Sequence, residues 1–177
     1  FVDFYCRQST CTIDNVNIKS GSHVKMSGLI GGYASGMNAV TITNCTIEKD
    51  VVIGDDGSWE GLDEAYYYSY GPGTQYVQYN DMVGSIAGAF NGTIRNCVSY
   101  ATVYGRNYVG GIIGFKGQSM GDCIVDSCVF AGKVIAKGEY AGGIMGSGYI
   151  AGTASNTSAP NTPLVTIQNC LMSGSVE

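Results

Sequence analysis

A four-residue pattern recurs five times along the chain, and it restricts the possible folds more than any other feature. The pattern is an apolar residue, any residue, Asn and then Cys. Two copies are degenerate, with Val replacing Cys in one and Ser replacing Asn in the other. The five copies are Ile13–Val16, Ile42–Cys45, Ile94–Cys97, Val125–Cys128 and Ile167–Cys170. A recurring pattern of this kind indicates one supersecondary unit that is stacked on itself.

A glycine-rich pattern alternates with the first one. It consists of a small or apolar residue, two small residues, two residues that are mostly apolar, and Gly. Its clear copies are Val109–Gly114 and Ala141–Gly146, and its looser copies are Met26–Gly31 and Val83–Gly88. Strict alternation of the two patterns predicts that each unit contains one of each.

The spacings show the length of the unit and where it is interrupted. Positions 16 and 45 are 29 residues apart and positions 97 and 128 are 31 apart, so the unit is about 30 residues long. Positions 45 and 97 are 52 residues apart, and positions 128 and 170 are 42 apart. We therefore predict two insertions, at about 54–82 and 147–164, the second of which is rich in Ser, Thr, Asn and Pro.

The unit is predicted to consist of short β-strands. Apolar and polar residues alternate in Val40–Thr43 and Val165–Gln168, which is typical of strands with one buried face. One unit cannot bury that face alone, whereas units stacked about 4.8 Å apart form a continuous core. The 27 glycines argue against a helical bundle, and the 45% of hydrophobic residues argues against disorder. We predict a single domain over 1–177, an all-β right-handed parallel β-helix of about five rungs.

The recurring Asn and Cys then acquire structural roles. At the bend between strands the backbone visits the left-handed region, which Asn tolerates, and its amide can hydrogen-bond the equivalent Asn of the next rung. The predicted ladder is Asn15, Asn44, Asn96, Ser127 and Asn169. The residue after each bend is predicted to point inward, in an apolar column of Val16, Cys45, Cys97, Cys128 and Cys170.

Composition excludes several classes of partner. The net charge is −5 and no basic cluster is present, so we expect no nucleic-acid binding. No apolar run is long enough for membrane insertion. Seven cysteines without a C-x-x-C pattern, and the single histidine His23, predict neither a metal site nor another cofactor. The sequence leaves open whether Cys6 and Cys11 form a disulfide.

The insertion at 54–82 is the predicted contact region. It holds the only Trp and six of the 13 Tyr. Aromatic rings beside carboxylates suit carbohydrate recognition, because a sugar's C–H face packs on a ring and its hydroxyls donate to carboxylates. The candidate binding residues are Trp59, Tyr66, Tyr67, Tyr68, Asp55, Asp56 and Glu60. The alternatives are a loop that covers one flank of the solenoid, and a pair of catalytic carboxylates. We assign no catalytic residue, and we interpret Gly54–Gly57 as a solvated turn rather than a calcium loop.

The Asn-Cys bend, followed by Val109–Gly114 and Ala141–Gly146, resembles the GLUG repeat, which occurs in arrays on large bacterial surface proteins such as IgA-peptidase-like proteins and adhesins. The resemblance covers most of residues 11–177. It weakens at Gly84–Gly88 and at the two insertions. It implies an extracellular bacterial β-solenoid, used as a stalk or as a binding surface, and it transfers no catalytic residue.

We therefore expect a non-catalytic adhesin or scaffold module at the cell surface, with a glycan or a surface protein as its partner. The alternatives are a carbohydrate-active β-helix enzyme, either a glycoside hydrolase or a lyase, and a fibre-forming subunit. Residues 173–177 cannot complete the rung that Ile167–Cys170 begins. We therefore expect this chain to be a piece of a longer protein, or to associate with itself end to end.

Overall fold

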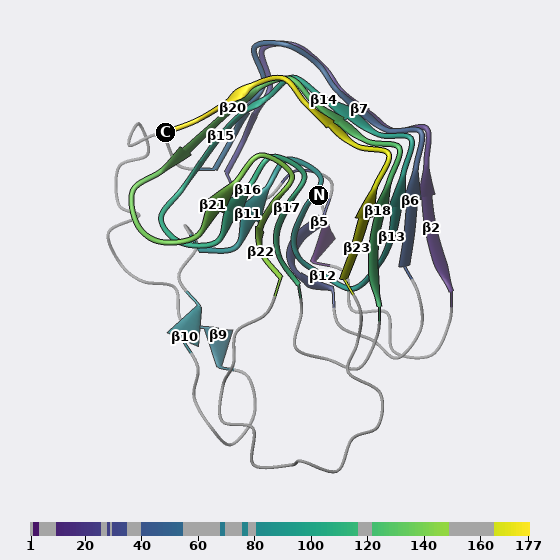
Figure 1. Ribbon diagram of the computed structural model, residues 1–177, viewed down its shortest axis with the longest axis horizontal. Coiled ribbons are helices and arrows are strands. Elements are labelled where there is room, and N and C mark those ends of the chain that lie inside the picture. The colour runs from purple at the N-terminus through teal and green to yellow at the C-terminus, as the bar shows by residue number, and fades with distance from the viewer. Residues whose placement is uncertain are drawn as a thin grey trace.

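The computed structural model confirms the predicted all-β class and the stacked parallel architecture (Figure 1). The described residues form strands joined by turns, bends and irregular segments, and they contain no helix. The structure describes residues 2–3, 10–25, 28, 30–34, 40–54, 68–69, 76–77, 81–116, 122–148 and 165–177.

The strands form five parallel sheets, which we number I to V in the order in which the chain visits them in each rung. Sheet I contains β2 (Cys11–Asp14), β6 (Val40–Thr43), β13 (Gly92–Arg95), β18 (Cys123–Asp126) and β23 (Val165–Gln168). Sheet II contains β3 (Asn17–Ile18), β7 (Thr46–Ile47), β14 (Val98–Ser99), β19 (Val129–Phe130) and β24 (Leu171–Met172). Sheet III contains β4 (His23–Val24), β8 (Val52–Ile53), β15 (Thr102–Gly105), β20 (Lys133–Ala136) and β25 (Ser175–Val176).

The remaining two sheets complete each rung. Sheet IV contains β11 (Val83–Gly84), β16 (Val109–Gly110) and β21 (Ala141–Gly142). Sheet V contains β1 (Val2–Asp3), β5 (Ile30–Ala34), β12 (Ala87–Phe90), β17 (Ile113–Lys116) and β22 (Met145–Ser147). Rungs 1 to 5 begin at β2, β6, β13, β18 and β23. An antiparallel pair, β9 (Tyr68–Ser69) and β10 (Tyr76–Val77), stands apart from the five sheets.

Equivalent residues of successive rungs lie directly over one another, and we call such a set a file. The strands of sheet I are paired without a shift from rung 1 to rung 5. One file of this sheet contains the first residue of every Asn-Cys pattern, namely Ile13, Ile42, Ile94, Val125 and Ile167. The unequal spacings in the sequence therefore correspond to equal steps in space.

The register also shows where the extra residues leave the stack. In rung 3 the chain passes directly from Val103 to Val109, whereas the paired positions in rung 2 are Ile53 and Val83. The large insertion therefore lies between sheets III and IV. The second long connection runs from β22 of sheet V to β23 of sheet I.

Sheets I, II and III form a curved outer wall, and sheets IV and V lie inside its curve (Figure 1). Inward side chains of all five sheets fill the space between them in one apolar cluster, which includes Ile47, Ile94, Ile112, Phe130 and Val134. Strands of sheet I, such as Val40–Thr43, present alternate residues to this cluster, which is why the period-2 alternation is visible in the sequence.

The glycine-rich pattern makes the tight turn from sheet IV to sheet V. Its last glycine lies where a sheet V strand crosses the sheet IV strand of the preceding rung. A Cβ on Gly114 would lie 2.5 Å from the Val83 nitrogen, and one on Gly146 would lie 2.6 Å from the Val109 nitrogen. Only glycine allows the two backbones to approach this closely.

Candidate functional site

The corner between sheets I and II is formed by the Asn-Cys patterns. All five residues before the Cys position have left-handed backbone conformations: Asn15 (φ 55°), Asn44 (56°), Asn96 (53°), Ser127 (54°) and Asn169 (53°). Asn is the commonest residue here because its short polar side chain tolerates this region. The same bend at every rung keeps the strands on both sides in register.

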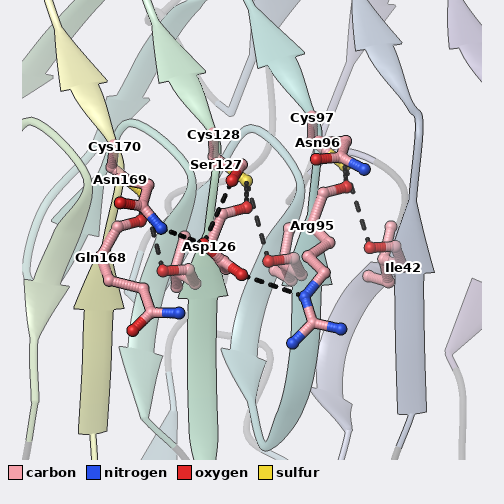
Figure 2. A network of polar contacts seen from close by, with 12 residues as sticks. Ile42, Arg95, Asn96, Cys97, Asp126, Ser127, Cys128, Gln168, Asn169 and Cys170 are labelled. Atoms are coloured by element: carbon pink, nitrogen blue, oxygen red, sulfur yellow. Dashed lines mark hydrogen bonds and ion pairs between the residues drawn. The ribbon is translucent and has the colours of Figure 1, made fainter.

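Two of the three side-chain amide bonds at this corner go to carboxylates, which differs from the predicted Asn-to-Asn ladder. Figure 2 shows the bond from Asn169 to Asp126. Asn44 Nδ2 donates to Asp14 Oδ1 at 2.7 Å, and Asn169 Nδ2 donates to Asp126 Oδ1 at 3.0 Å. The one direct amide pair, Asn96 Nδ2 to Asn44 Oδ1, is longer at 3.5 Å. A carboxylate is a stronger acceptor than an amide oxygen, so the Asn side chains turn toward it.

Sequence reasoning missed the two acidic residues of this corner, Asp14 and Asp126. Each directly precedes the left-handed residue of its own rung, which is the signal that could have identified them. The hydrogen bond from Asn169 holds the pKa of Asp126 below its usual value, and those from Thr43 and Asn44 do the same for Asp14. Asp126 also pairs with Arg95, with 3.1 Å between Nε and Oδ2. Both carboxylates are thus held in the ionised form.

The residues after the bend form a thiol file. Cys45, Cys97 and Cys128 are fully buried, and Cys170 is partly buried. Val16, which we predicted to be inward in the same column, is 40% exposed because it lies on rung 1, at the end of the stack. Each thiol donates to the carbonyl two residues earlier, and one of these bonds runs from Cys97 Sγ to Arg95 O at 3.2 Å. Cys therefore supplies a small apolar body and a weak donor in one side chain.

Burial suppresses the reactivity of Cys45, Cys97 and Cys123. Desolvation raises the pKa of Cys45, and the neighbouring Cys128 thiol together with burial raises the pKa of Cys97. Burial also raises the pKa of Cys123, a cysteine outside the file, to about 12. The thiolate is the reactive form, and a pKa of 12 leaves about one thiol in ten thousand ionised at pH 8.

We therefore expect thiol labelling of the folded protein at pH 8 to modify Cys170 at least about a hundredfold faster than Cys45, Cys97 or Cys123. Peptide mass spectrometry after timed labelling measures these rates, and labelling in denaturant provides the reference in which all thiols react. Fast labelling of Cys97 in the folded state would contradict the burial of this file.

A second polar corner lies between sheets III and IV, where the large insertion rejoins the stack. Asp81 accepts hydrogen bonds from Arg106 through Nε at 3.1 Å and through the terminal Nη2 at 2.9 Å. It also accepts from the Asn107 backbone and side-chain amides, at 3.3 and 3.1 Å. The Asn107 side-chain oxygen accepts from the Glu139 backbone amide at 2.9 Å, so three consecutive rungs are joined. These bonds fix the corner.

Two tyrosines stack on this corner. The rings of Tyr108 and Tyr140 are 5.0 Å apart and inclined by only 6°. Tyr108 also packs on Phe115, and Tyr140 is 54% exposed. Both residues have left-handed backbones, as does Met82 one rung earlier. Burial raises the pKa of Tyr108, and nearby Tyr140, Asp81 and Glu139 act in the same direction, so this phenol stays neutral.

Sequence reasoning missed this tyrosine pair as well. Each ring directly precedes a glycine-rich pattern, Tyr108 before Val109–Gly114 and Tyr140 before Ala141–Gly146. That shared position is the signal that places the rings in one file. Each ring therefore belongs to the repeating unit rather than to the insertion.

The predicted binding residues of the insertion lie outside the described residues. They are Trp59, Tyr66, Tyr67, Asp55, Asp56 and Glu60, together with the side chain of Tyr68, whose backbone belongs to β9. Cys6 also lies outside the described part. The structure does locate the ends of the insertion, because Gly54 follows β8 and Asp81 lies at the Tyr108–Tyr140 corner. His23 Nε2 donates to the Gly54 carbonyl at 3.2 Å, on sheet III rather than beside the thiol file.

Within the described residues, no group of three or more His, Cys, Asp or Glu side chains is placed to hold a metal ion. The same part of the chain contains no helix long and apolar enough to cross a membrane. Comparisons with protein-family models, with curated proteins and with solved structures found no match.

Proposed function

We propose that this protein is a non-catalytic adhesin or scaffold module at a bacterial cell surface, and that it contacts glycans at the corner between sheets III and IV. The observation that carries the proposal is the Tyr108–Tyr140 stack. Tyr140 is supported on one face by a parallel ring and is 54% exposed. A flat ring that is held in place and exposed is the surface on which the C–H face of a sugar packs.

The polar groups at this corner suit the hydroxyls of a sugar. Asn107 and Glu139 lie in the rungs of Tyr108 and Tyr140, one residue before each ring. Asp81 and the Glu139 backbone amide hold the Asn107 side chain in place, so little side-chain entropy is lost when a ligand binds. The aromatic ring suits the C–H face of a sugar, and the amide and carboxylate beside it suit the sugar's hydroxyls.

The insertion extends the proposed contact surface. It leaves the stack after β8 and returns at Asp81, which contacts the rung of Tyr108. We include Trp59, Tyr66, Tyr67, Tyr68, Asp55, Asp56 and Glu60 in the proposed surface because they belong to a segment anchored at this corner.

The carboxyl groups of the described residues support the non-catalytic part of the proposal. In the described residues, the carboxyl groups with a shifted pKa are Asp14, Glu48 and Asp126, and all three shifts are downward. A general acid requires an upward shift, so these groups suit structural hydrogen bonding. The resemblance of the two patterns to the GLUG repeat favours an extracellular bacterial location.

Binding to a glycan array tests the proposal. We expect Tyr140→Ala to weaken binding about five- to thirtyfold, the usual effect of removing an aromatic anchor. Tyr100→Ala is the matched control, because Tyr100 is also exposed, at 38%, but lies in rung 3 outside this corner. Trp59→Ala tests the insertion in the same assay. Absence of binding by the unmodified chain, or equal binding by the Tyr140 and Tyr100 variants, would contradict the proposal.

A further inference from the structure

The thiol file brings sulfur atoms of consecutive rungs together inside the stack. Cys97 of rung 3 and Cys128 of rung 4 are both fully buried. The Val129 amide donates to the Cys97 carbonyl at 2.9 Å, so the backbones of the two cysteines lie one strand spacing apart. That spacing is about 4.8 Å, within the range of about 4.4–6.8 Å between the Cα atoms of bonded cysteines. The file therefore already holds two thiols at the separation of a disulfide.

The side chains of these two cysteines also meet. Cys128 Sγ lies 3.8 Å from the Ile94 carbonyl oxygen of rung 3 and 3.3 Å from the Asp126 carbonyl oxygen of its own rung. Its sulfur therefore stands between the two rungs. The two thiols hydrogen-bond with each other, and Figure 2 shows both cysteines on neighbouring strands of the corner.

The hydrogen bond gives the two thiols different acidities. The bond from Cys97 lowers the pKa of Cys128, although burial acts in the opposite direction. The same contact, together with burial, raises the pKa of Cys97. The pair therefore loses its first proton from Cys128, and the Cys97 thiol donates to the resulting thiolate. A thiolate beside a second thiol is the arrangement that oxidation converts into a disulfide.

We propose that Cys97 and Cys128 form a reversible disulfide, which joins rung 3 to rung 4 when the protein is exposed to a peroxide. The Cys128 thiolate attacks one peroxide oxygen and the O–O bond breaks, which leaves a sulfenic acid on Cys128. The departing hydroxide takes up the proton that Cys128 released and becomes water. The Cys97 sulfur then attacks the Cys128 sulfur, the S–O bond breaks, and the hydroxide leaves with the Cys97 proton as a second water. The two thiols lose two electrons, and the peroxide accepts both.

Burial of the pair selects the oxidant and determines the consequence of oxidation. A peroxide is little larger than water, so it reaches the corner through small local openings of the stack. Cys97 and Cys128 are 31 positions apart in the sequence. A bond between them would restrict the unfolded chain and thereby stabilise the folded one. This inference is independent of glycan binding.

Peptide mapping of the unmodified chain tests which cysteines become linked. The folded protein is treated with hydrogen peroxide, its remaining thiols are blocked, and it is digested with trypsin without a reductant. Cleavage places Cys97 in the peptide 96–106, and Cys128 together with Cys123 in the peptide 117–133. These two peptides should become linked through Cys128, and dithiothreitol should separate them. Cys123→Ser is the matched control, because Cys123 is equally buried but lies outside the file, and it should keep the link. No link, or links mainly through Cys123, Cys45 or Cys170, would overturn the proposal.

Removal of one thiol tests the order of the two steps. Cys97→Ser should stop the reaction at the sulfenic acid of Cys128, so that dimedone labels Cys128 at least about tenfold more than in the unmodified chain. Cys128→Ser should leave Cys97 largely unoxidised. The oxidised unmodified chain should melt about 5 °C higher than the reduced chain, whereas peroxide should not raise the melting temperature of Cys97→Ser. Circular dichroism checks that both variants keep their strands, and the mapping of the unmodified chain decides the matter if one does not. Equal dimedone labelling of Cys128 with and without Cys97 would overturn the proposal.

Discussion

Gly114→Ala should lower the free energy of unfolding by about 3 kcal/mol, because its new Cβ would overlap the backbone of the preceding rung. It would lie 2.5 Å from the Val83 nitrogen and 2.8 Å from the Met82 oxygen. Both atoms belong to the backbone of a neighbouring strand, so a change of rotamer cannot relieve the overlap. Urea unfolding followed by circular dichroism measures the loss.

Gly148→Ala is the matched control for this substitution. A Cβ on Gly148 would have Val165 Cγ2 at 3.8 Å as its nearest neighbour, which is an ordinary van der Waals contact. We expect its stability to stay within about 0.5 kcal/mol of the unmodified chain. Similar losses in both variants would mean that glycine contributes through backbone flexibility, and that the close crossing of sheets IV and V is not the cause.

Phe130→Ala should cost about 3–5 kcal/mol, the usual range for truncating a buried aromatic side chain. Phe130 is fully buried in sheet II, and its file neighbour on rung 3 is the small Ser99. Its ring also fills the space that the missing side chain of Gly111 leaves. For a chain of this size we expect the melting temperature to fall by about 6–20 °C.

Tyr100→Ala provides the comparison for Phe130→Ala, since it removes an aromatic ring of similar size that is 38% exposed. We expect a change of about 0.5 kcal/mol or less in that variant. Thermal unfolding of both variants, in the same buffer and at the same protein concentration, measures the difference. Equal melting temperatures would show that the inward file of sheet II is not well packed.

The repeat could be predicted from the sequence because each rung uses the same residues at the same bend. A left-handed corner favours Asn, and a buried position beside it favours a small side chain. Both constraints therefore produce residue types that recur in the sequence. Ile13, Ile42 and Ile94 accordingly occupy one file, although their separations in the sequence differ. The inserted residues leave the stack at a corner, where they do not shift the register.

The side-chain partners could not be predicted in the same way. The Asn ladder depends on Asp14 and Asp126, which recur on only two rungs, with Thr43, Arg95 and Gln168 at the other three positions. Val16 is exposed because it lies on the first rung of the stack. The four-residue pattern alone does not show which rung is the first. The shared position of Tyr108 and Tyr140 before the glycine-rich pattern places them in one file, but the stacking of their rings is visible only in the structure.

The unshifted register of sheet I also determines how such a protein can change in length. Because the strands of each rung pair only with strands of adjacent rungs, duplicating the stretch that begins at β13 and ends before β18 would insert one complete layer in the same backbone register. Such a duplication would lengthen the rod by about 4.8 Å. Unequal recombination between coding segments of adjacent layers would therefore yield folded products of many sizes.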